Sequence, residues 1–484
     1  MSLSSIDYII IGVYLIGIAL FGIISGGKQK TTEDYFAGSK TIPWWAVCFS
    51  IVAAETSTLT FISVPGLAYL TNLNFLQIAF GFLLGRIVVA FVFLPAYDKG
   101  GLKTAYTYLE ERFGKKTRLF AAIVFLFTRI AADGVRLFAT AIPLKLMLDI
   151  SYPTAIVIIA IISLIYTYTG GLKGIIWVDV IQMFIYLGGA IVAGIFILNL
   201  LPNGIDSVIN AADKAHKFSI INLGFQGGVK NFFAQPYTLL GGILGGMFLS
   251  MASHGTDQLI VQRLFAARNL KDGQKAVIGS GVIIIFQFAI FLILGVMLYA
   301  YYGSLNVRSD EIFPMFIINV LSHGIRGIII AGLFAAAMST LAASMSSLSS
   351  STVLDLYLPF TKKEINEKKK LKTSRLFTII WAVLLILSAV SFMESSKAVV
   401  EIALSIASFT YGGLLGTFLL GIFVKKAKQN SALFGFIFGI LTMIVVISIH
   451  IVAWTWFTLI GVIATLIFGK IFIALHSNNR LQNS

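Results

Sequence analysis

Long apolar segments follow one another along this chain from residue 6 to residue 475, and short polar loops separate them. A membrane-spanning helix needs roughly 20 apolar residues, because the hydrocarbon core of a bilayer is about 30 Å thick. Of the 484 residues, 58% are hydrophobic and only 12% are charged. The mean hydropathy of +0.91 is higher than a water-soluble core of this length requires. The sequence therefore predicts an all-α, polytopic protein that lies in a lipid bilayer.

We expect about thirteen spans, taken as apolar runs bounded by charged or turn residues. The first run is expected to be a retained helix rather than a signal peptide, since no basic segment precedes it and no small-residue cleavage site follows. The runs are residues 6–25, 44–69, 73–97, 117–146, 152–169, 174–201, 234–254, 275–301, 325–356, 374–393, 398–424, 431–450 and 454–475.

The loop lysines and arginines gather on one side of this topology. Cytoplasmic loops are enriched in Lys and Arg, which predicts an outside N-terminus and a cytoplasmic C-terminus, in a bacterial inner membrane. The net charge of +15 does not indicate nucleic-acid binding, because the basic residues lie in short loops. The loops that carry most of this charge are 26–42, 98–118, 170–173, 256–274, 357–373, 425–430 and the C-terminal tail.

Small and polar residues interrupt two of the apolar runs at mid-depth. Residues 53–60 read AAETSTLT, and residues 335–351 read AAAMSTLAASMSSLSSS. A buried carboxylate such as Glu55 needs a partner or a cavity. Close helix packing through small residues is one explanation. A broken helix with free carbonyls, facing hydroxyls that bind a monovalent cation, is the other, and the presence of both features in one chain favours it.

The two polar runs fall early in two blocks of similar length, each with five expected helices. The first block is 43–201 and the second is 234–424. Because five is odd, the second block would enter the membrane in the inverted orientation, which is the symmetry that supports alternating access. A leading helix and cytoplasmic loop (1–42), an extracellular loop (202–233), and two trailing helices with a tail (425–484) complete the chain.

Six motifs resemble, in the same order, those of the sodium:solute symporter family, over about residues 5–430. The resemblance implies a leucine-transporter-type core of five plus five inverted helices, with one leading and two trailing helices. It implies a sodium-coupled symporter that imports a small organic solute and functions as a monomer. The motifs are DYFAGSKTIPWW (34–45), ETSTLTFISVPG (55–66), AYTYLEERFG (105–114), GGLKGIIWVDVIQ (170–182), DQLIVQRLFAAR (257–268, resembling N-Q-x-x-x-Q-R), and FAAAMST (334–340) with VLDLY (353–357).

The resemblance also implies a sodium site. A second sodium in some relatives uses an aspartate, matched here by Asp179, and two hydroxyls whose positions read Ala342 and Ala343. We therefore expect one sodium per solute, with Asp179 acting either in coupling or as a structural hydrogen-bonding group. The expected sodium ligands are the backbone carbonyls of Ala53, Thr56 and Ala336 and the side chains of Ser339 and Thr340.

The solute is expected to bind between the broken helix and its neighbours. Glu55 could pair with a substrate amine, attract sodium, or neutralise a buried arginine. Arg129, Asp133 and Arg136 share one helical face. They could form an internal ion network with Arg86 or Glu55. Alternatively, one of the arginines could bind a carboxylate of the solute, and together with Glu55 it would form a pocket for a zwitterion. The position of the carboxylate-binding arginine of sialic-acid symporters reads Ala132 here. The expected solute-binding residues are Glu55, Ser57, Thr60, Phe75, Ala79, Asp133 and Tyr411.

Other classes of function are less consistent with the sequence. We find no catalytic signature such as H-E-x-x-H, a nucleophile elbow or a P-loop, so an enzyme is not expected. No short re-entrant filter segment indicates a channel. A zwitterion or amino acid and a sugar remain open as the solute, and a proton-coupled or sodium-independent transporter of the same fold remains the alternative.

Overall fold

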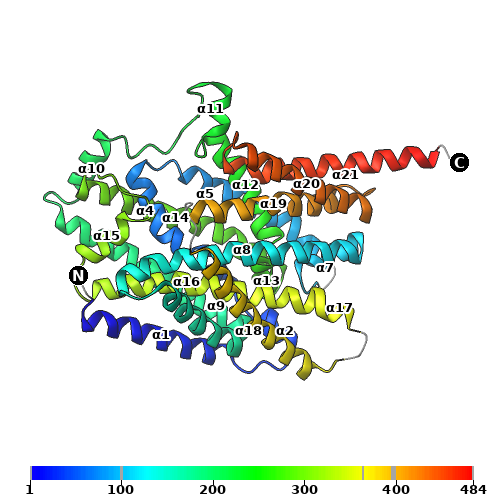
Figure 1. Cartoon of the computed structure of the whole chain (residues 1–484), viewed down its shortest axis with the longest axis horizontal. Coiled ribbons are helices and arrows are strands. Elements are labelled where there is room, and N and C mark those ends of the chain that lie inside the picture. The colour runs from blue at the N-terminus through cyan, green and yellow to red at the C-terminus, as the bar shows by residue number, and fades with distance from the viewer. Residues whose placement is uncertain (1–2, 99–101, 362–364, 394–398, 482–484) are drawn as a thin grey trace.

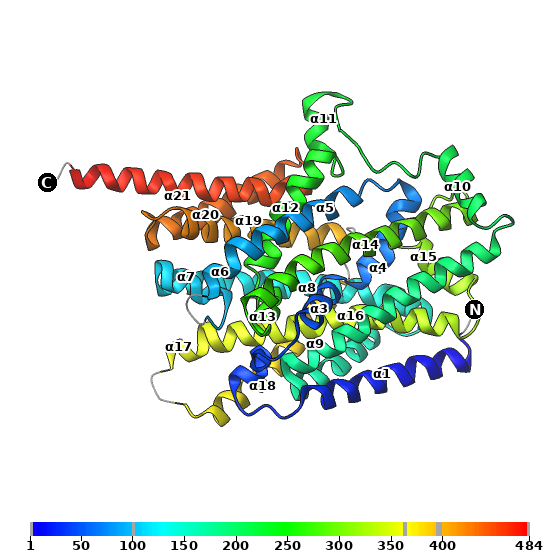
Figure 2. The same ribbon diagram turned by 180° about the vertical axis from the view of Figure 1, so that it is seen from behind.

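The computed structural model describes residues 3–98, 102–361, 365–393 and 399–481, and these ranges contain helices and no β-strand. Most of the long helices run side by side along the long axis of the molecule (Figures 1 and 2). The long elements are α1 (Ser5–Gly26), α3 (Trp44–Glu55) with α4 (Thr58–Leu70), α5 (Leu76–Val88) with η2 (Val89–Phe93) and α6 (Leu94–Asp98), α8 (Lys115–Leu148), α9 (Tyr152–Leu200), α12 (Leu239–Gly255), α14 (Leu270–Tyr302), α16 (Ile325–Ser351) with η3 (Thr352–Tyr357) and α17 (Leu358–Phe360), α18 (Glu367–Ser391), α19 (Val399–Phe423), α20 (Gln429–Ile449) and α21 (Phe457–Leu481).

Shorter helices occupy the connections between these elements. They are α2 (Thr32–Ala37), η1 (Gly38–Lys40), α7 (Ala105–Phe113), α10 (Ile205–Lys214), α11 (Gly228–Ala234), α13 (Gln258–Phe265), α15 (Ile312–Asn319) and η4 (Trp454–Trp456). Every apolar run expected to span the membrane coincides with one or more long helices. By length and hydropathy, nine helices of the described ranges could cross a membrane, or ten when the bent pair α3–α4 is included. Thirteen crossings therefore stay a prediction.

The sequence predicts a loop at 170–173, and the structure instead has a kink within α9. This helix of 49 residues has a contour length of about 73 Å, more than twice the bilayer core, so it can cross twice around the kink. Gly171 has φ +55° and ψ −161°, which a residue with a side chain rarely adopts. A Cβ on Gly26 of α1 would lie 2.2 Å from the Cα of Gly170, so the two backbones touch. Two adjacent glycines thus make the turn without a loop.

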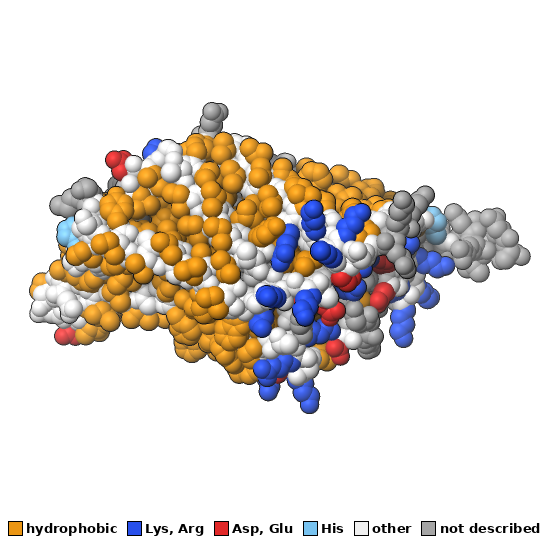
Figure 3. Space-filling model, turned by 90° about the horizontal axis from the view of Figure 1, so that it is seen from below, with side chains coloured by type: hydrophobic (Ala, Val, Ile, Leu, Met, Phe, Trp, Pro, Cys, Tyr) orange, Lys and Arg blue, Asp and Glu red, His pale blue; other side chains and the backbone are white. Residues whose placement is uncertain are grey.

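The exterior and the centre of the bundle differ as a membrane protein requires. Figure 3 shows hydrophobic side chains over most of one face and lysines and arginines gathered toward one end of it. Helix α16, in contrast, is buried on all sides along almost its whole length. Small and hydroxyl residues lie on every side of this helix, a composition that suits close packing against other helices rather than contact with lipid.

Candidate functional site

The helix predicted at 44–69 is broken at its middle. Its halves α3 and α4 meet at an angle of 69°, and Thr56 between them has an extended backbone with ψ 100°. The amide of Thr56 still bonds to the carbonyl of Val52. The carbonyls that follow Val52 in α3 have no next helical turn to supply amide donors, because the chain bends after Glu55. Ser57 caps α4, and its hydroxyl accepts a bond from the amide of Thr60. The break therefore offers backbone carbonyls in the protein interior.

Helix α16 lies against this break. The hydroxyl of Thr58 donates to the carbonyl of Leu333 at 3.2 Å, which joins α4 to α16. The hydroxyl of Thr340 donates to the carbonyl of Ala336 at 3.2 Å, and that of Ser339 donates to Oδ1 of Asp179 at 2.6 Å. Both hydroxyl oxygens keep lone pairs that can face a cation. The five residues expected to bind sodium are all buried, and they lie on α3, at the break that follows it, and on α16, which contacts α3: Ala53, Thr56, Ala336, Ser339 and Thr340.

Asp179 of α9 is fully buried and joins four helices. Besides Ser339 of α16, its carboxylate accepts from the hydroxyl of Ser50 in α3 at 2.5 Å and from Nη2 of Arg263 in α13 at 3.0 Å. Arg263, which is also fully buried, donates to Ser50 as well. These hydrogen bonds are consistent with the structural role considered for Asp179, and they reach an expected sodium ligand directly, so its role in coupling stays a prediction as well.

Glu55, the last residue of α3, forms an ion pair with Arg86 of α5. The Arg86 side chain is fully buried, and its Nη1 also donates to the hydroxyl of Ser280 at 2.8 Å. His254 of α12 lies with Nε2 3.7 Å from the same carboxylate. Of the three roles considered for Glu55, neutralisation of a buried arginine is the one that this geometry displays.

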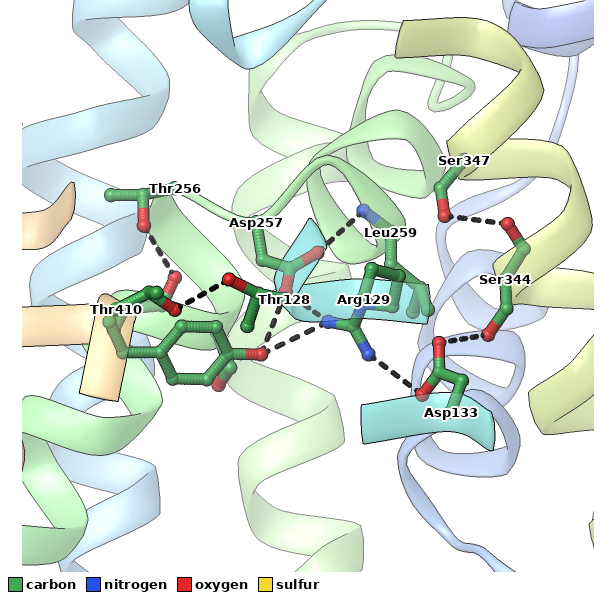
Figure 4. A network of polar contacts seen from close by, with 12 residues as sticks. Thr128, Arg129, Asp133, Thr256, Asp257, Leu259, Ser344, Ser347 and Thr410 are labelled. Atoms are coloured by element: carbon green, nitrogen blue, oxygen red, sulfur yellow. Dashed lines mark hydrogen bonds and ion pairs between the residues drawn. The ribbon is translucent and has the colours of Figure 1, made fainter. Parts of the chain in front are cut away.

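The three charged residues of α8 do not pair with Arg86 or Glu55, which corrects one of the two expectations for them. Arg129 instead forms an ion pair with Asp257 (Figure 4). Its Nη2 also lies 3.0 Å from the hydroxyl of Tyr411. Asp133 bridges Arg129 at 3.3 Å and Arg136 at 3.4 Å, and it accepts a bond from the hydroxyl of Ser344 in α16. The reason is geometric, since Asp257, the N-terminal cap of α13, reaches Arg129 in the middle of α8, and Arg86 is occupied by Glu55.

Sequence reasoning did not select Asp257, although a signal was available. It stands where the resembled segment N-Q-x-x-x-Q-R has an asparagine. A carboxylate in place of a neutral amide, in a membrane protein that has arginines in a nearby helix, requires a positive partner. Besides Arg129, Asp257 accepts from the hydroxyl of Tyr411 at 2.7 Å and from the amide of Leu259 at 2.9 Å.

A small cavity lies between α8, α16 and the helix break. It joins two residues of the expected solute site, Ser57 and Asp133, to Thr340 of the expected sodium site. Sequence reasoning had not placed Leu137 and Thr140 of α8 there. The lining residues are Ser57, Asp133, Arg136, Leu137, Thr140, Ala337, Thr340 and Leu341.

The remaining residues of the expected solute site lie outside the lining of this cavity. Phe75 packs its ring against Tyr237 and Phe288, with centroids 5.5 and 5.0 Å away. Ala79 is fully buried in α5. Thr60 lies one turn beyond Ser57, and Tyr411 is engaged by Asp257. The structure therefore gathers only part of the expected set around one space.

The chain is similar to known proteins over almost its whole length. A family model described as the sodium:solute symporter family matches residues 35–439. The sodium/sialic acid symporter NanT of Aliivibrio fischeri is 29% identical over 99% of this chain and 95% of its own length. The corresponding symporter SiaT of Proteus mirabilis is 30% identical over 91% and 89%. A solved structure of a substrate-bound, outward-open Na⁺-coupled sialic acid symporter covers 98% of both chains, with 28% identity and a TM-score of 0.87.

Proposed function

Because the chain belongs to the sodium:solute symporter family, whose members are multi-pass transporters and not enzymes, we propose that it imports a small organic solute together with sodium by alternating access. The observation that carries this proposal is the shared cavity. Ser57 at the helix break, Asp133 of α8 and Thr340 of α16 line the same space. A solute and a sodium ion bound there would each favour the same arrangement of helices, which is the condition for coupling two fluxes.

Sodium is proposed to bind the carbonyls of Ala53, Thr56 and Ala336 and the hydroxyls of Ser339 and Thr340. Carbonyl and hydroxyl oxygens are neutral and hard, so they can hold a monovalent cation and still release it. The bond from Ser339 to Asp179 supports this assignment, because a hydroxyl that donates its proton to a carboxylate directs its lone pairs elsewhere.

One sodium per solute is proposed. A second ion beside Asp179 would need further oxygen ligands, and the next turn of α16 supplies Ala342 and Ala343. Both oxygens of Asp179 are already bonded, to Ser50, Ser339 and Arg263. We propose that this carboxylate assists coupling by linking the sodium ligand Ser339 to α13.

The solute site is proposed around Ser57, Thr60 and Asp133, with Glu55, Phe75, Ala79 and Tyr411 in the surrounding shell. The relatives named above are sialic acid symporters, whereas the family resemblance places Ala132 at the position of the arginine that binds the carboxylate in such symporters. We therefore propose a solute that is held differently from sialic acid.

The topology is proposed as expected from the loops. Blocks 43–201 and 234–424 are the inverted repeats, flanked by 1–42, the extracellular loop 202–233 and 425–484. The N-terminus would lie outside and the C-terminus in the cytoplasm of a bacterial inner membrane. The gathering of lysines and arginines at one end of the molecule supports this orientation (Figure 3). Nothing in the proposed site requires a second copy of the chain, so a monomer is proposed as the transporting unit.

A screen over many candidate solutes tests the proposal. Purified protein is melted with a metabolite library in sodium and, separately, in potassium, because a ligand that binds the folded state raises the melting temperature. We expect a solute that stabilises the protein in sodium and much less in potassium. That solute should then accumulate in proteoliposomes when an inward sodium gradient is imposed. Accumulation driven equally by a proton gradient without sodium would contradict sodium coupling.

A further inference from the structure

Four charged side chains lie at or beside the cavity, and they differ in how many hydrogen bonds and ion pairs they make. They are Arg129, Asp133, Arg136 and Asp257. Arg129 is buried between two carboxylates, Asp133 and Asp257, and also contacts the hydroxyl of Tyr411. Asp257 in turn accepts from Arg129, from Tyr411 and from a backbone amide. Arg129 and Asp257 therefore neutralise one another with close hydrogen bonds, which leaves Asp133 and Arg136 as the second pair.

This second pair is loose. Oδ2 of Asp133 is taken by the hydroxyl of Ser344, and both arginines share Oδ1, with Arg129 at 3.3 Å and Arg136 at 3.4 Å. Close N–H···O bonds measure about 2.9 Å, and charge-assisted ones are shorter still. Within the described residues, this 3.4 Å contact is the only hydrogen bond that the Arg136 side chain makes. Its Nε and Nη2 donors have no protein partner there.

The open donors of Arg136 are accessible. Its side chain is 26% exposed and lines the cavity, whereas the side chain of Arg129 is 7% exposed. An arginine inside a membrane-spanning helix normally faces a cavity or a partner, because an uncompensated charge at this depth is costly. The hydroxyls of Ser57 and Thr340 line the same space. Arg136 is thus a cation presented to whatever fills the cavity.

We propose that Arg136 binds a carboxylate of the transported solute, so that the solute is a small organic anion with one carboxylate. This inference rests on the proposed symport function. A guanidinium presents parallel N–H donors that match both oxygens of a carboxylate. The Nε and Nη2 donors, which have no partner among the described residues, can form such a paired contact, while Nη1 keeps its bond to Asp133.

The charge balance of the site favours one negative charge on the solute. Arg129, Arg136, Asp133 and Asp257 sum to zero, and Glu55 with Arg86 also sums to zero. One sodium ion adds a positive charge, which a monocarboxylate cancels before the loaded site crosses the low-dielectric interior. A zwitterion would need a free carboxylate for its amine, and the Glu55 carboxylate is occupied by Arg86. A neutral sugar would leave the open donors of Arg136 with weaker acceptors.

Paired probes test this inference. Wild-type protein is melted in sodium and in potassium with lactate and lactamide, nicotinate and nicotinamide, N-acetylneuraminate and its methyl ester, and alanine as a zwitterion. We expect at least one carboxylate to raise the melting temperature in sodium, and its uncharged counterpart to have no comparable effect. Arg136→Gln should weaken the apparent affinity for that carboxylate roughly tenfold to a hundredfold, because one charge-assisted contact is lost.

Two further variants test whether the effect is specific to the guanidinium group of Arg136. Arg136→Lys keeps the charge without the planar fork, so the affinity should fall between those of the wild type and Arg136→Gln. If Arg136→Gln does not fold, the lysine variant carries the test. Arg308→Gln removes an arginine that is 63% exposed, pairs with Asp310 and does not line the cavity, and it should leave the carboxylate response unchanged. Stabilisation by sodium alone should persist in all three variants.

Several outcomes would overturn the carboxylate inference while leaving symport intact. These are a sodium-dependent response to uncharged or zwitterionic probes that equals the response to carboxylates, an absence of any response to carboxylates, or an unchanged carboxylate affinity in the Arg136 variants. A loss of sodium dependence for every solute in the metabolite screen would instead refute the proposed function itself. The two failures are therefore distinguishable.

Discussion

Replacement of Glu55 by glutamine provides the sharpest test of the charge arrangement at the helix break. The substitution keeps the size of the side chain and much of its hydrogen bonding but removes its charge. The Arg86 guanidinium would then stay fully buried with the hydroxyl of Ser280 and the glutamine oxygen as its acceptors. His254, 3.7 Å from the carboxylate, would lose the same anion.

The size of the effect follows from the burial of Arg86. Removal of one partner from a buried ion pair costs about 3–5 kcal/mol, because the other charge remains in a low-dielectric site. Such a loss lowers the ratio of folded to unfolded protein by roughly two to almost four powers of ten. Replacement of both partners, as in Glu55→Gln with Arg86→Met, should recover much of this loss, since no uncompensated charge is left.

The assay is thermal or denaturant unfolding of purified wild type and variants, with sodium, solute, both or neither. We expect Glu55→Gln to be less stable under all four conditions and the double variant to be more stable than the single one. Asp310→Asn is a matched control, because it breaks an ion pair whose arginine is 63% exposed and should change stability by no more than about 1 kcal/mol. Equal melting of wild type and Glu55→Gln without ligands would refute the reasoning. A loss confined to the solute-bound condition would instead assign Glu55 to the solute.

Three further predictions concern sodium and the α8 network. Ser339→Ala and Thr340→Ala should each raise the sodium concentration for half-maximal uptake severalfold in folded protein, and an unchanged sodium titration in both would reject these ligands. Uptake should depend on sodium with a Hill coefficient near one. A Hill coefficient near two in the wild type that decreases in the Asp179→Asn variant would contradict a single sodium site. Asp257→Asn should lower the free energy of unfolding by about 3–5 kcal/mol, because the buried Arg129 would keep the Tyr411 hydroxyl but only one carboxylate, Asp133 at 3.3 Å, which it shares with Arg136, and an unchanged melting temperature would show that this pair is dispensable.

The fold class could be predicted from the sequence, and the comparisons confirm it. Apolar runs of membrane-spanning length leave little choice but helices, and the likeness to a solved symporter over 98% of both chains supports the leucine-transporter-type core. The break at residues 56–57 was also predictable, since a carboxylate and four hydroxyls interrupt an apolar run. The direct joining of two helices at Gly171 was not, because it depends on the contact of Gly170 with the backbone of α1.

The ionic partners were harder to predict than the charged residues themselves. A buried arginine could be expected opposite Glu55, but the choice of Arg86 over Arg129 or Arg136 depends on how α5 and α8 are placed around the break. Pairing across such sequence separations is decided by helix packing rather than by helical periodicity. Periodicity did place Asp133 on one face with both of its arginines, because residues three and four apart are neighbours on a helix.

Two polar networks converge on the short helix α13, and this convergence suggests how the two ligands could be coupled. From the expected sodium ligand Ser339, hydrogen bonds lead through Asp179 to Arg263 at the end of α13. From the cavity residue Asp133, contacts lead through Arg129 to Asp257 at its beginning.

The intervening residues of α13 also bond to α16. Gln258 donates to the hydroxyl of Ser350, and Gln262 donates to that of Ser346. A change in the packing of α16 at either site would therefore have to be accommodated by α13. Contacts alone do not establish coupling, which requires an element whose two positions both ligands bias. Asp257→Asn loosens one attachment of α13 and leaves the sodium ligands in place. If α13 is that element, this substitution should reduce the effect of solute on sodium affinity and, by thermodynamic reciprocity, the effect of sodium on solute affinity by the same factor.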